Sequence, residues 1–100
     1  MYGTIFRMKV KSGKEREVVA AFEKWERERK PKVAGAVASL LLKLDKVPGE
    51  FLGVAVFKDK ESYTANAKDS EQDKWYGQLR LLLQSDPEWN DGEYVFSKLG

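Results

Sequence analysis

The chain has 100 residues, of which 42% are hydrophobic and 34% are charged, as expected for one soluble domain spanning residues 1–100. Its 18 basic and 16 acidic residues leave a net charge of only +2, which gives no electrostatic footprint for nucleic acid or a membrane surface. Cysteine and histidine are both absent. Disulfides, thiol nucleophiles, histidine bases and a Ser-His-Asp hydrolase are therefore excluded.

Several further classes lack their sequence signals. The chain contains no glycine-rich phosphate loop and no metal-ligand cluster, so we expect neither a cofactor nor a metal. The basic-glycine-aromatic signature of RNA-binding modules is missing as well. Because no signal region and no long apolar run is seen, a cytoplasmic location is the default expectation.

Alternating residues predict a first strand at 2–11, with Tyr2, Thr4, Phe6, Met8 and Val10 on one face. Ser12 followed three residues later by Glu15 fits a capping box, which predicts a helix that runs to about Lys30 and stops at Pro31. The apolar stripe of this helix has helical spacing and consists of Val18, Ala21, Phe22 and Trp25.

Two strands follow, at 36–45 and 51–58, joined by Val47-Pro48-Gly49-Glu50, which is typical of a type II turn. In the first, alternation places Ala36, Ala38, Leu40, Leu42 and Leu44 on one face. The second is apolar on both faces: Phe51, Gly53, Ala55 and Phe57 form one, and Leu52, Val54 and Val56 form the other.

The remainder predicts a short helix at 60–67 capped by Asp59, a longer one from Ser70 to about Gln84, and a last strand at 92–99. The order β-α-β-β-α-β indicates the ferredoxin-like α+β fold, with two helices on one face of an antiparallel sheet. The helices can cover only one face. A sheet with a second apolar face, here Leu52, Val54 and Val56 with Leu41, therefore predicts a homodimer.

Three features together resemble the antibiotic biosynthesis monooxygenase-like family of dimeric α+β barrels. They are Lys11-Ser12-Gly13-Lys14 after a short opening strand, the Pro48-Gly49 hairpin, and Glu61-Ser62-Tyr63 opening a broken second helix. The resemblance covers nearly the whole chain. It implies a homodimer whose two sheets pack together, and a small-molecule cavity between each sheet and its own helices.

The family's oxygenase branch uses asparagine, tryptophan, tyrosine and arginine without a cofactor, and Asn66, Trp75, Tyr76 and Arg80 match that set by residue type. The resemblance thus implies Asn66 and Tyr76 as catalytic residues. For Asn66 the alternative is a helix C-terminal cap, and for Tyr76 it is an amphipathic core tyrosine. The expected ligand-binding residues between sheet and helices are Phe6, Leu40, Leu42, Phe57, Trp75, Leu79 and Arg80.

The family's haem-degrading branch places asparagine, tryptophan and histidine in the cavity, where this chain has Phe6, Asn66 and Tyr76. Haem degradation is therefore not expected. We expect a cofactor-free monooxygenase acting on an apolar or aromatic substrate. The alternatives are a non-catalytic binding protein and a structural dimer with a filled core. Gly77 within a helix and the outward Leu81 break local rules, which also leaves open an engineered binding or enzyme variant of this scaffold.

Overall fold

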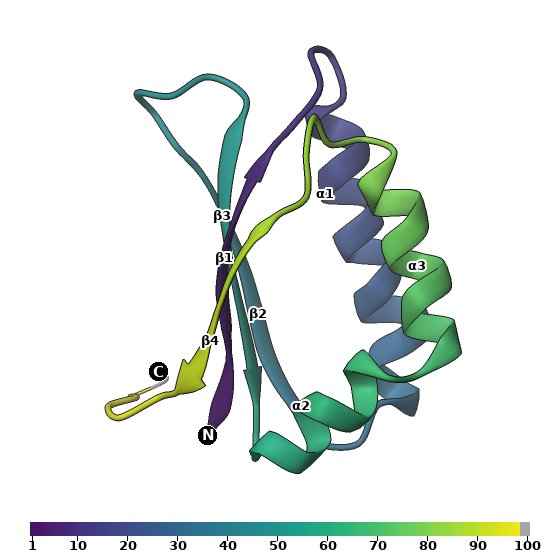
Figure 1. Cartoon of the computed structure of the whole chain (residues 1–100), viewed down its shortest axis with the longest axis vertical. Coiled ribbons are helices and arrows are strands. Elements are labelled where there is room, and N and C mark those ends of the chain that lie inside the picture. The colour runs from purple at the N-terminus through teal and green to yellow at the C-terminus, as the bar shows by residue number, and fades with distance from the viewer. Residues whose placement is uncertain (99–100) are drawn as a thin grey trace.

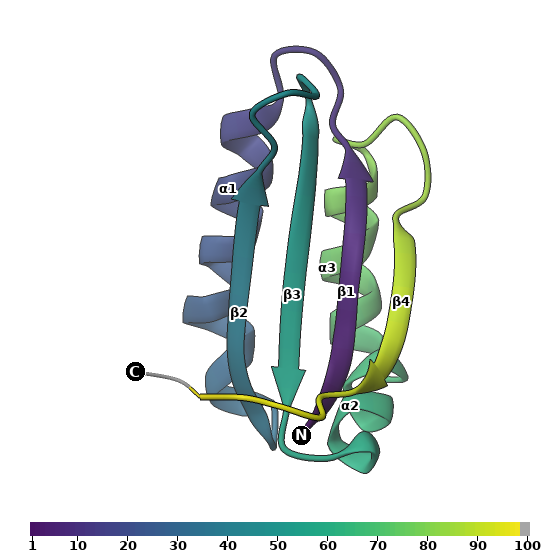
Figure 2. The same ribbon diagram turned by 90° about the vertical axis from the view of Figure 1, so that its left-hand side faces the viewer.

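The computed structural model describes residues 1–98. One layer of helices covers one face of a four-stranded sheet, and the other face carries no helix (Figure 1). The strand order is β2-β3-β1-β4 (Figure 2). The elements are β1 (Tyr2–Lys9), α1 (Glu15–Lys24), a π-helical turn (Trp25–Arg29), a 3-10 turn (Lys30–Lys32), β2 (Ala36–Lys43), β3 (Glu50–Phe57), α2 (Lys60–Ala67), α3 (Ser70–Arg80) and β4 (Glu88–Glu93). This is the expected ferredoxin-like α+β fold.

All neighbouring strands are antiparallel, and β1 lies between β3 and β4. The hairpin from β2 to β3 turns at Gly49, whose φ of 79° is the left-handed conformation that a type II turn requires. The bond from the Glu50 N–H to the Val47 carbonyl, at 3.1 Å, closes this turn as predicted. Gly53 lies opposite Phe6, and a Cβ at this position would overlap the Phe6 ring.

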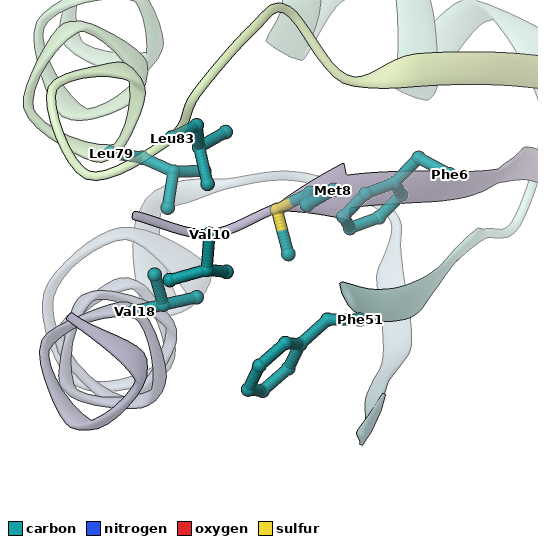
Figure 3. Packing of buried hydrophobic residues seen from close by; sticks show 7 residues of the cluster. All are labelled: Phe6, Met8, Val10, Val18, Phe51, Leu79 and Leu83. Carbon is teal, nitrogen blue, oxygen red and sulfur yellow. The ribbon is translucent and has the colours of Figure 1, made fainter. Parts of the chain in front are cut away.

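The main core lies at one end of the layer between sheet and helices. Its buried side chains come from β1, α1, β3, α3 and the turn after α3, and Figure 3 shows them meeting: Phe6, Met8, Val10, Val18, Phe51, Leu79 and Leu83. Each fully buried aliphatic side chain of this kind contributes about 1.5–3 kcal/mol of transfer free energy. The packed end fixes the helices against the sheet, while toward α2 a partly open cavity lies between the helices and the sheet.

The first helix differs from its expected limits at both ends. It begins at Glu15 after Lys14, whose side chain makes no capping bond, so the predicted capping role of Ser12 is wrong. The α-helical pattern ends at Lys24, and Trp25–Arg29 form a π-helical turn. A π turn changes the direction in which its side chains point, and such turns are frequent at functional sites.

The helical segment between β3 and β4 breaks into α2 and α3 where expected. Asp59 accepts a bond from the Ser62 N–H at 2.8 Å and caps α2, whereas Asp69 rather than Ser70 caps α3, accepting from the Glu71 N–H at 2.8 Å. The last strand is β4 at Glu88–Glu93, so the predicted strand at 92–99 is placed too late; Leu99 lies outside the described residues.

The largest correction concerns β2. Its pairing with β3 shifts between Ala36, opposite Phe57, and Ala38, opposite Val56, which leaves Val37 as a bulge. One extra residue inverts the alternation beyond it. Leu40 and Leu42 are consequently 66% and 55% exposed on the face away from the helices, while Leu41 packs against the core. The predicted facings of these three leucines are wrong.

The face of the sheet away from the helices, here called the outer face, is apolar over its centre. Its members come from three strands: Ile5, Leu40, Leu42, Leu52, Val54 and Val56. After β4 the chain crosses this face near the N-terminus (Figure 2). Within residues 1–98, no helix combines the length and apolarity needed to cross a membrane.

Candidate functional site

A cavity of about 400 Å³ lies between the sheet and the helices, within the range of small-molecule sites. Its walls are mainly apolar, and their aromatic side chains include Phe6, Phe22, Phe57, Trp75, Tyr76 and Trp89. They come from β1, α1, β3, α3 and β4, so the cavity depends on the whole fold. Its floor on the sheet includes the small residue Ala55, which leaves room above β3.

The aromatic walls pack against one another in a continuous chain. The Phe6 ring lies 5.1 Å from Trp89 and 6.1 Å from Phe22, measured between ring centroids. Phe22 meets Trp75 edge-on at 5.2 Å, and Tyr76 lies 6.0 Å from Trp89. Offset and edge-to-face rings stabilise each other by about 0.5–1.5 kcal/mol per pair beyond their buried area. The cavity is thus a preformed apolar surface suited to an aromatic molecule.

The π-helical turn supplies the polar contacts on the α1 side. Trp25 donates from Nε1 to Gln72 Oε1 at 2.7 Å, which links the turn to α3. Glu26 accepts from Lys30 Nζ at 2.9 Å and from Ser39 Oγ at 3.4 Å, which links it to β2. Arg29 donates to Asn66 on α2. The apolar spacing predicts a regular helix over this segment and does not indicate these contacts.

Asn66 lines the cavity from the last turn of α2. Its side-chain oxygen Oδ1 accepts a hydrogen bond from Arg29 Nη2 at 2.8 Å. The backbone carbonyl of Asn66 accepts from the Asp69 N–H at 3.1 Å, but its side chain makes no capping bond. Among residues 1–98 the Asn66 amide nitrogen has no acceptor. The side chain is therefore placed to offer an N–H donor to the cavity.

Tyr76 lines the cavity from α3, and its hydroxyl has no hydrogen-bond partner within the described part of the chain. Burial raises the pKa of its phenol above the ordinary value, and the nearby Asp86 carboxylate raises that pKa further. A phenol with a raised pKa stays protonated at neutral pH. Tyr76 is therefore suited to donating a hydrogen bond and poorly suited to accepting a proton.

A second polar pair was not predicted from the sequence. Tyr63 on α2 donates from its hydroxyl to Asp91 Oδ1 on β4 at 2.8 Å, and both line the cavity. Burial of the Tyr63 phenol, together with its bond to the Asp91 carboxylate, raises the pKa of that phenol. The pair joins elements 28 residues apart. No local spacing indicates such a contact, and the family resemblance points to the position of Tyr63 alone.

Of the predicted site residues, the structure brings six to one cavity: Phe6, Phe57, Asn66, Trp75, Tyr76 and Leu79. Leu40 and Leu42 do not line it, because the bulge in β2 turns them to the outer face. Arg80 does not line it either. Its guanidinium bonds Asp86 Oδ1 at 2.7 Å and the Leu83 carbonyl at 3.0 Å, which holds the turn after α3.

Neither Gly77 nor any group of acidic side chains within the described residues marks a further site. Gly77 lies on the exposed side of α3, and a Cβ added there would meet nothing within 4 Å. It therefore makes no room for a close neighbour within the chain. Among residues 1–98, no three acidic side chains gather in a way that would hold a metal ion.

No family model and no curated protein matches the sequence. Solved structures do match. A protein described as an antibiotic biosynthesis monooxygenase from Nitrosomonas europaea has a TM-score of 0.77 and 17% identity, over 96% of this chain and 100% of its own. Another so described, from Caulobacter crescentus, has a TM-score of 0.82 and 13% identity, over 95% and 90%.

A third match is SnoaB, a cofactor-independent oxygenase from Streptomyces nogalater solved as an asparagine-to-alanine variant. Its TM-score is 0.78 and its identity 17%, over 96% of this chain and 94% of its own. Identities this low establish the fold alone. The chain therefore resembles antibiotic biosynthesis monooxygenases in having their ferredoxin-like α+β fold over nearly its full length.

Proposed function

We propose that the protein is a homodimeric, cofactor-independent oxygenase of a small aromatic substrate that is acidic at carbon or oxygen. The observation that carries the proposal is a cavity with aromatic walls that is lined by Asn66, whose amide N–H has no acceptor among residues 1–98. The fold shared with SnoaB supports the same reading.

The reaction that suits this cavity needs only the substrate and O₂. An anthrone-like substrate loses a proton from its methylene carbon and passes one electron to O₂, and the resulting radical and superoxide combine to form a C–O bond. The peroxide then loses its second methylene proton as its O–O bond breaks. One oxygen atom remains as a quinone carbonyl and the other leaves as water, so four electrons pass from the substrate to O₂.

The protein's residues would lower the barrier by binding the anionic form of the substrate. The walls are largely apolar, so a hydrogen bond made against them is stronger than the same bond in bulk water. Asn66 and the neutral Tyr76 would donate to the developing oxyanion of the substrate. Asn66 lies in the last turn of α2, and Tyr76 lies about 9 Å along the helix axis from the start of α3, at 1.5 Å per residue. Asn66 and Tyr76 would then hold one ligand from two directions.

Proton removal requires an acceptor. The Asp91 carboxylate lines the cavity and already holds a phenolic hydroxyl, that of Tyr63, at 2.8 Å. In its enol form the anthrone-like substrate carries this proton on a hydroxyl, which has the same donor chemistry as the Tyr63 phenol. We assign Asp91 as the group that accepts a substrate proton. Tyr76 is unsuited to this role, because the raised pKa of its phenol keeps it protonated.

Dimerisation is supported by the outer face. Leu40 and Leu42 are more than half exposed there, and they adjoin the half-buried Leu52, Val54 and Val56. The chain after β4 is anchored to the sheet by Tyr94, whose hydroxyl donates to the Ala55 carbonyl at 2.7 Å. Beyond it, Val95 and Phe96 are 92% and 84% exposed. A second copy, sheet against sheet, would cover both apolar features.

The test is oxygen uptake with anthrone, followed with an oxygen electrode while quinone formation is recorded by absorbance. We expect one O₂ consumed for each quinone formed, and loss of most of the rate in Asn66→Ala. Glu61→Ala, an exposed change elsewhere on α2, is the matched control and should keep the rate. Wild-type protein that leaves anthrone oxidation at the uncatalysed rate would contradict the proposal.

A second function, binding without turnover, is favoured by one observation. Arg80 lies outside the cavity, and the Trp75 indole N–H bonds the Ala21 carbonyl at 2.8 Å, so both are used within the fold. Fewer polar groups then remain for catalysis than residue types alone suggested. Tight anthrone binding without oxygen uptake would support this function, and mass spectrometry of copurifying small molecules would identify its ligand.

A further inference from the structure

Arg29 is a nearly buried cation whose shortest side-chain bond goes to a neutral partner. Its side chain is 12% exposed. Nη2 lies 2.8 Å from Asn66 Oδ1 but 3.7 Å from the Asp69 carboxylate. Its Nε is buried and has no partner among residues 1–98. A charge held this deeply is costly unless it is well compensated. The shortest hydrogen bond of Arg29 holds the side-chain amide of Asn66 in one orientation.

The chemistry of the two side chains determines how Asn66 is oriented. A guanidinium has only donors, so Asn66 must direct its carbonyl oxygen toward Arg29. The amide nitrogen, on the opposite branch, then points away from Arg29. Asn66 lines the cavity and Arg29 does not, which places the amide N–H on the cavity side. The cation also polarises the carbonyl, which strengthens the N–H as a donor.

We propose that Arg29 is a positioning residue: it fixes the Asn66 amide with its N–H toward the cavity and strengthens that donor for an oxyanionic ligand. This role rests on the proposed function of Asn66. It also accounts for the π-helical turn. The turn ends at Arg29 and carries it to the junction of α2 and α3.

A purely structural role would give Arg29 a different task. Its contact with Asp69, the residue that caps α3, would then serve only to hold the junction of the two helices. In that case, replacing Arg29 would lower the stability of the fold. It would weaken ligand binding indirectly, whether or not Asn66 is present. The two roles therefore differ in whether the effect of Arg29 passes through Asn66.

A double-mutant cycle in the full chain separates them, with anthrone as the probe and binding measured by quenching of tryptophan fluorescence. Arg29→Met keeps the aliphatic length and removes all donors. We expect it to weaken anthrone binding by about tenfold in the wild-type background, the usual effect of a lost bond to a charged or oriented group. In the Asn66→Ala background the same change should have no further effect. Equal losses in both backgrounds would overturn the proposal.

Arg29→Lys is the matched variant, because it keeps the charge and loses the planar fork. It should retain part of the affinity and the full thermal stability of the wild type, whereas a structural role would give parallel losses in both. Exposed Arg27, two residues earlier in the same turn, provides the control Arg27→Met, which should leave binding unchanged.

A ligand-independent measurement keeps the inference separate from the proposed function. The Asn66 side-chain amide resonances, assigned by their loss in Asn66→Ala, should show slow rotation about the C–N bond in the wild type, because the guanidinium polarises the carbonyl. In Arg29→Met this rotation should become faster. Failure of wild-type protein to bind anthrone would contradict the proposed function alone, whereas identical amide rotation in the two proteins would contradict the role of Arg29.

Discussion

Trp75 donates from its indole Nε1 to the backbone carbonyl of Ala21 at 2.8 Å, and this bond joins α3 to α1 across the roof of the cavity. The same carbonyl accepts the backbone N–H of Trp25. The indole is therefore fixed by its polar edge, and it contributes an apolar surface to the cavity. The indole N–H of Trp75 therefore contributes to stability, whereas its ring surface is available to a ligand.

Trp75→Phe should lower the free energy of unfolding by about 1–3 kcal/mol, because it removes the bond to Ala21 and part of a packed ring. Anthrone binding should weaken less than it does in Asn66→Ala, since an aromatic wall remains. Chemical denaturation and fluorescence titration measure the two effects. Full stability combined with complete loss of binding would show that the indole N–H serves the ligand.

Tyr76→Phe removes one hydroxyl and keeps the ring against Trp89. We expect the affinity for anthrone, or its turnover, to fall by roughly 1–3 kcal/mol, the penalty for an unmatched polar group, with a nearly unchanged thermal midpoint. Tyr94→Phe is the matched control, because its hydroxyl bonds the Ala55 carbonyl and the residue does not line the cavity. Full activity with a large loss of stability in Tyr76→Phe would make it a core residue.

Leu40→Lys tests the outer face as a dimer interface. In an isolated chain this leucine is 66% exposed, so a lysine there should cost little. In a dimer formed through the outer face it would bury an unpaired charge and dissociate the subunits. Leu81→Lys, at a leucine 71% exposed immediately after α3, is the control and should remain dimeric. A folded wild-type monomer at micromolar concentration in light scattering would contradict the dimer.

The Tyr63 phenol predicts a specific dependence of stability on alkaline pH. Its pKa in the folded state lies above the ordinary value of 10, because of burial and its bond to Asp91. A raised folded-state pKa gives stability that is fully present below pH 10 and is lost as the pH rises through the folded-state value. The stability difference between wild type and Tyr63→Phe should therefore stay constant up to about pH 9 and shrink as the pH rises above about 10. A constant difference would contradict the assignment.

The order of elements could be predicted from the sequence, because the chemistry of turns and helix caps is local. The apolar faces of β3 could be predicted as well, because successive side chains of a strand alternate between its faces. Asp59 caps α2 and Gly49 turns the hairpin as expected. The facing of β2 could not, since both of its faces are apolar and a single bulge residue, Val37, reverses the alternation. In β4, the turn-forming residues Asn90, Asp91 and Gly92 form a strand because pairing with β1 overrides their local preference.

The candidate site was partly predictable. Asn66, Trp75 and Tyr76 were found through the family resemblance, and they line one cavity. The partners that orient them were not found. The contacts from Arg29 to Asn66 and from Tyr63 to Asp91 join distant elements, and the first depends on a π-helical turn that no periodicity indicates.

The most direct test of the central claim is to fill the cavity and measure ligand binding. Ala55 lies on the cavity floor, so Ala55→Leu would place a larger side chain in the space for the ligand. Ala65→Leu, at an exposed position on α2, is the matched control. Fluorescence titration with anthrone should show saturable binding to the wild type and to Ala65→Leu, and loss of binding in a folded Ala55→Leu protein. Equal affinity in all three would contradict the claim that this cavity is the functional site.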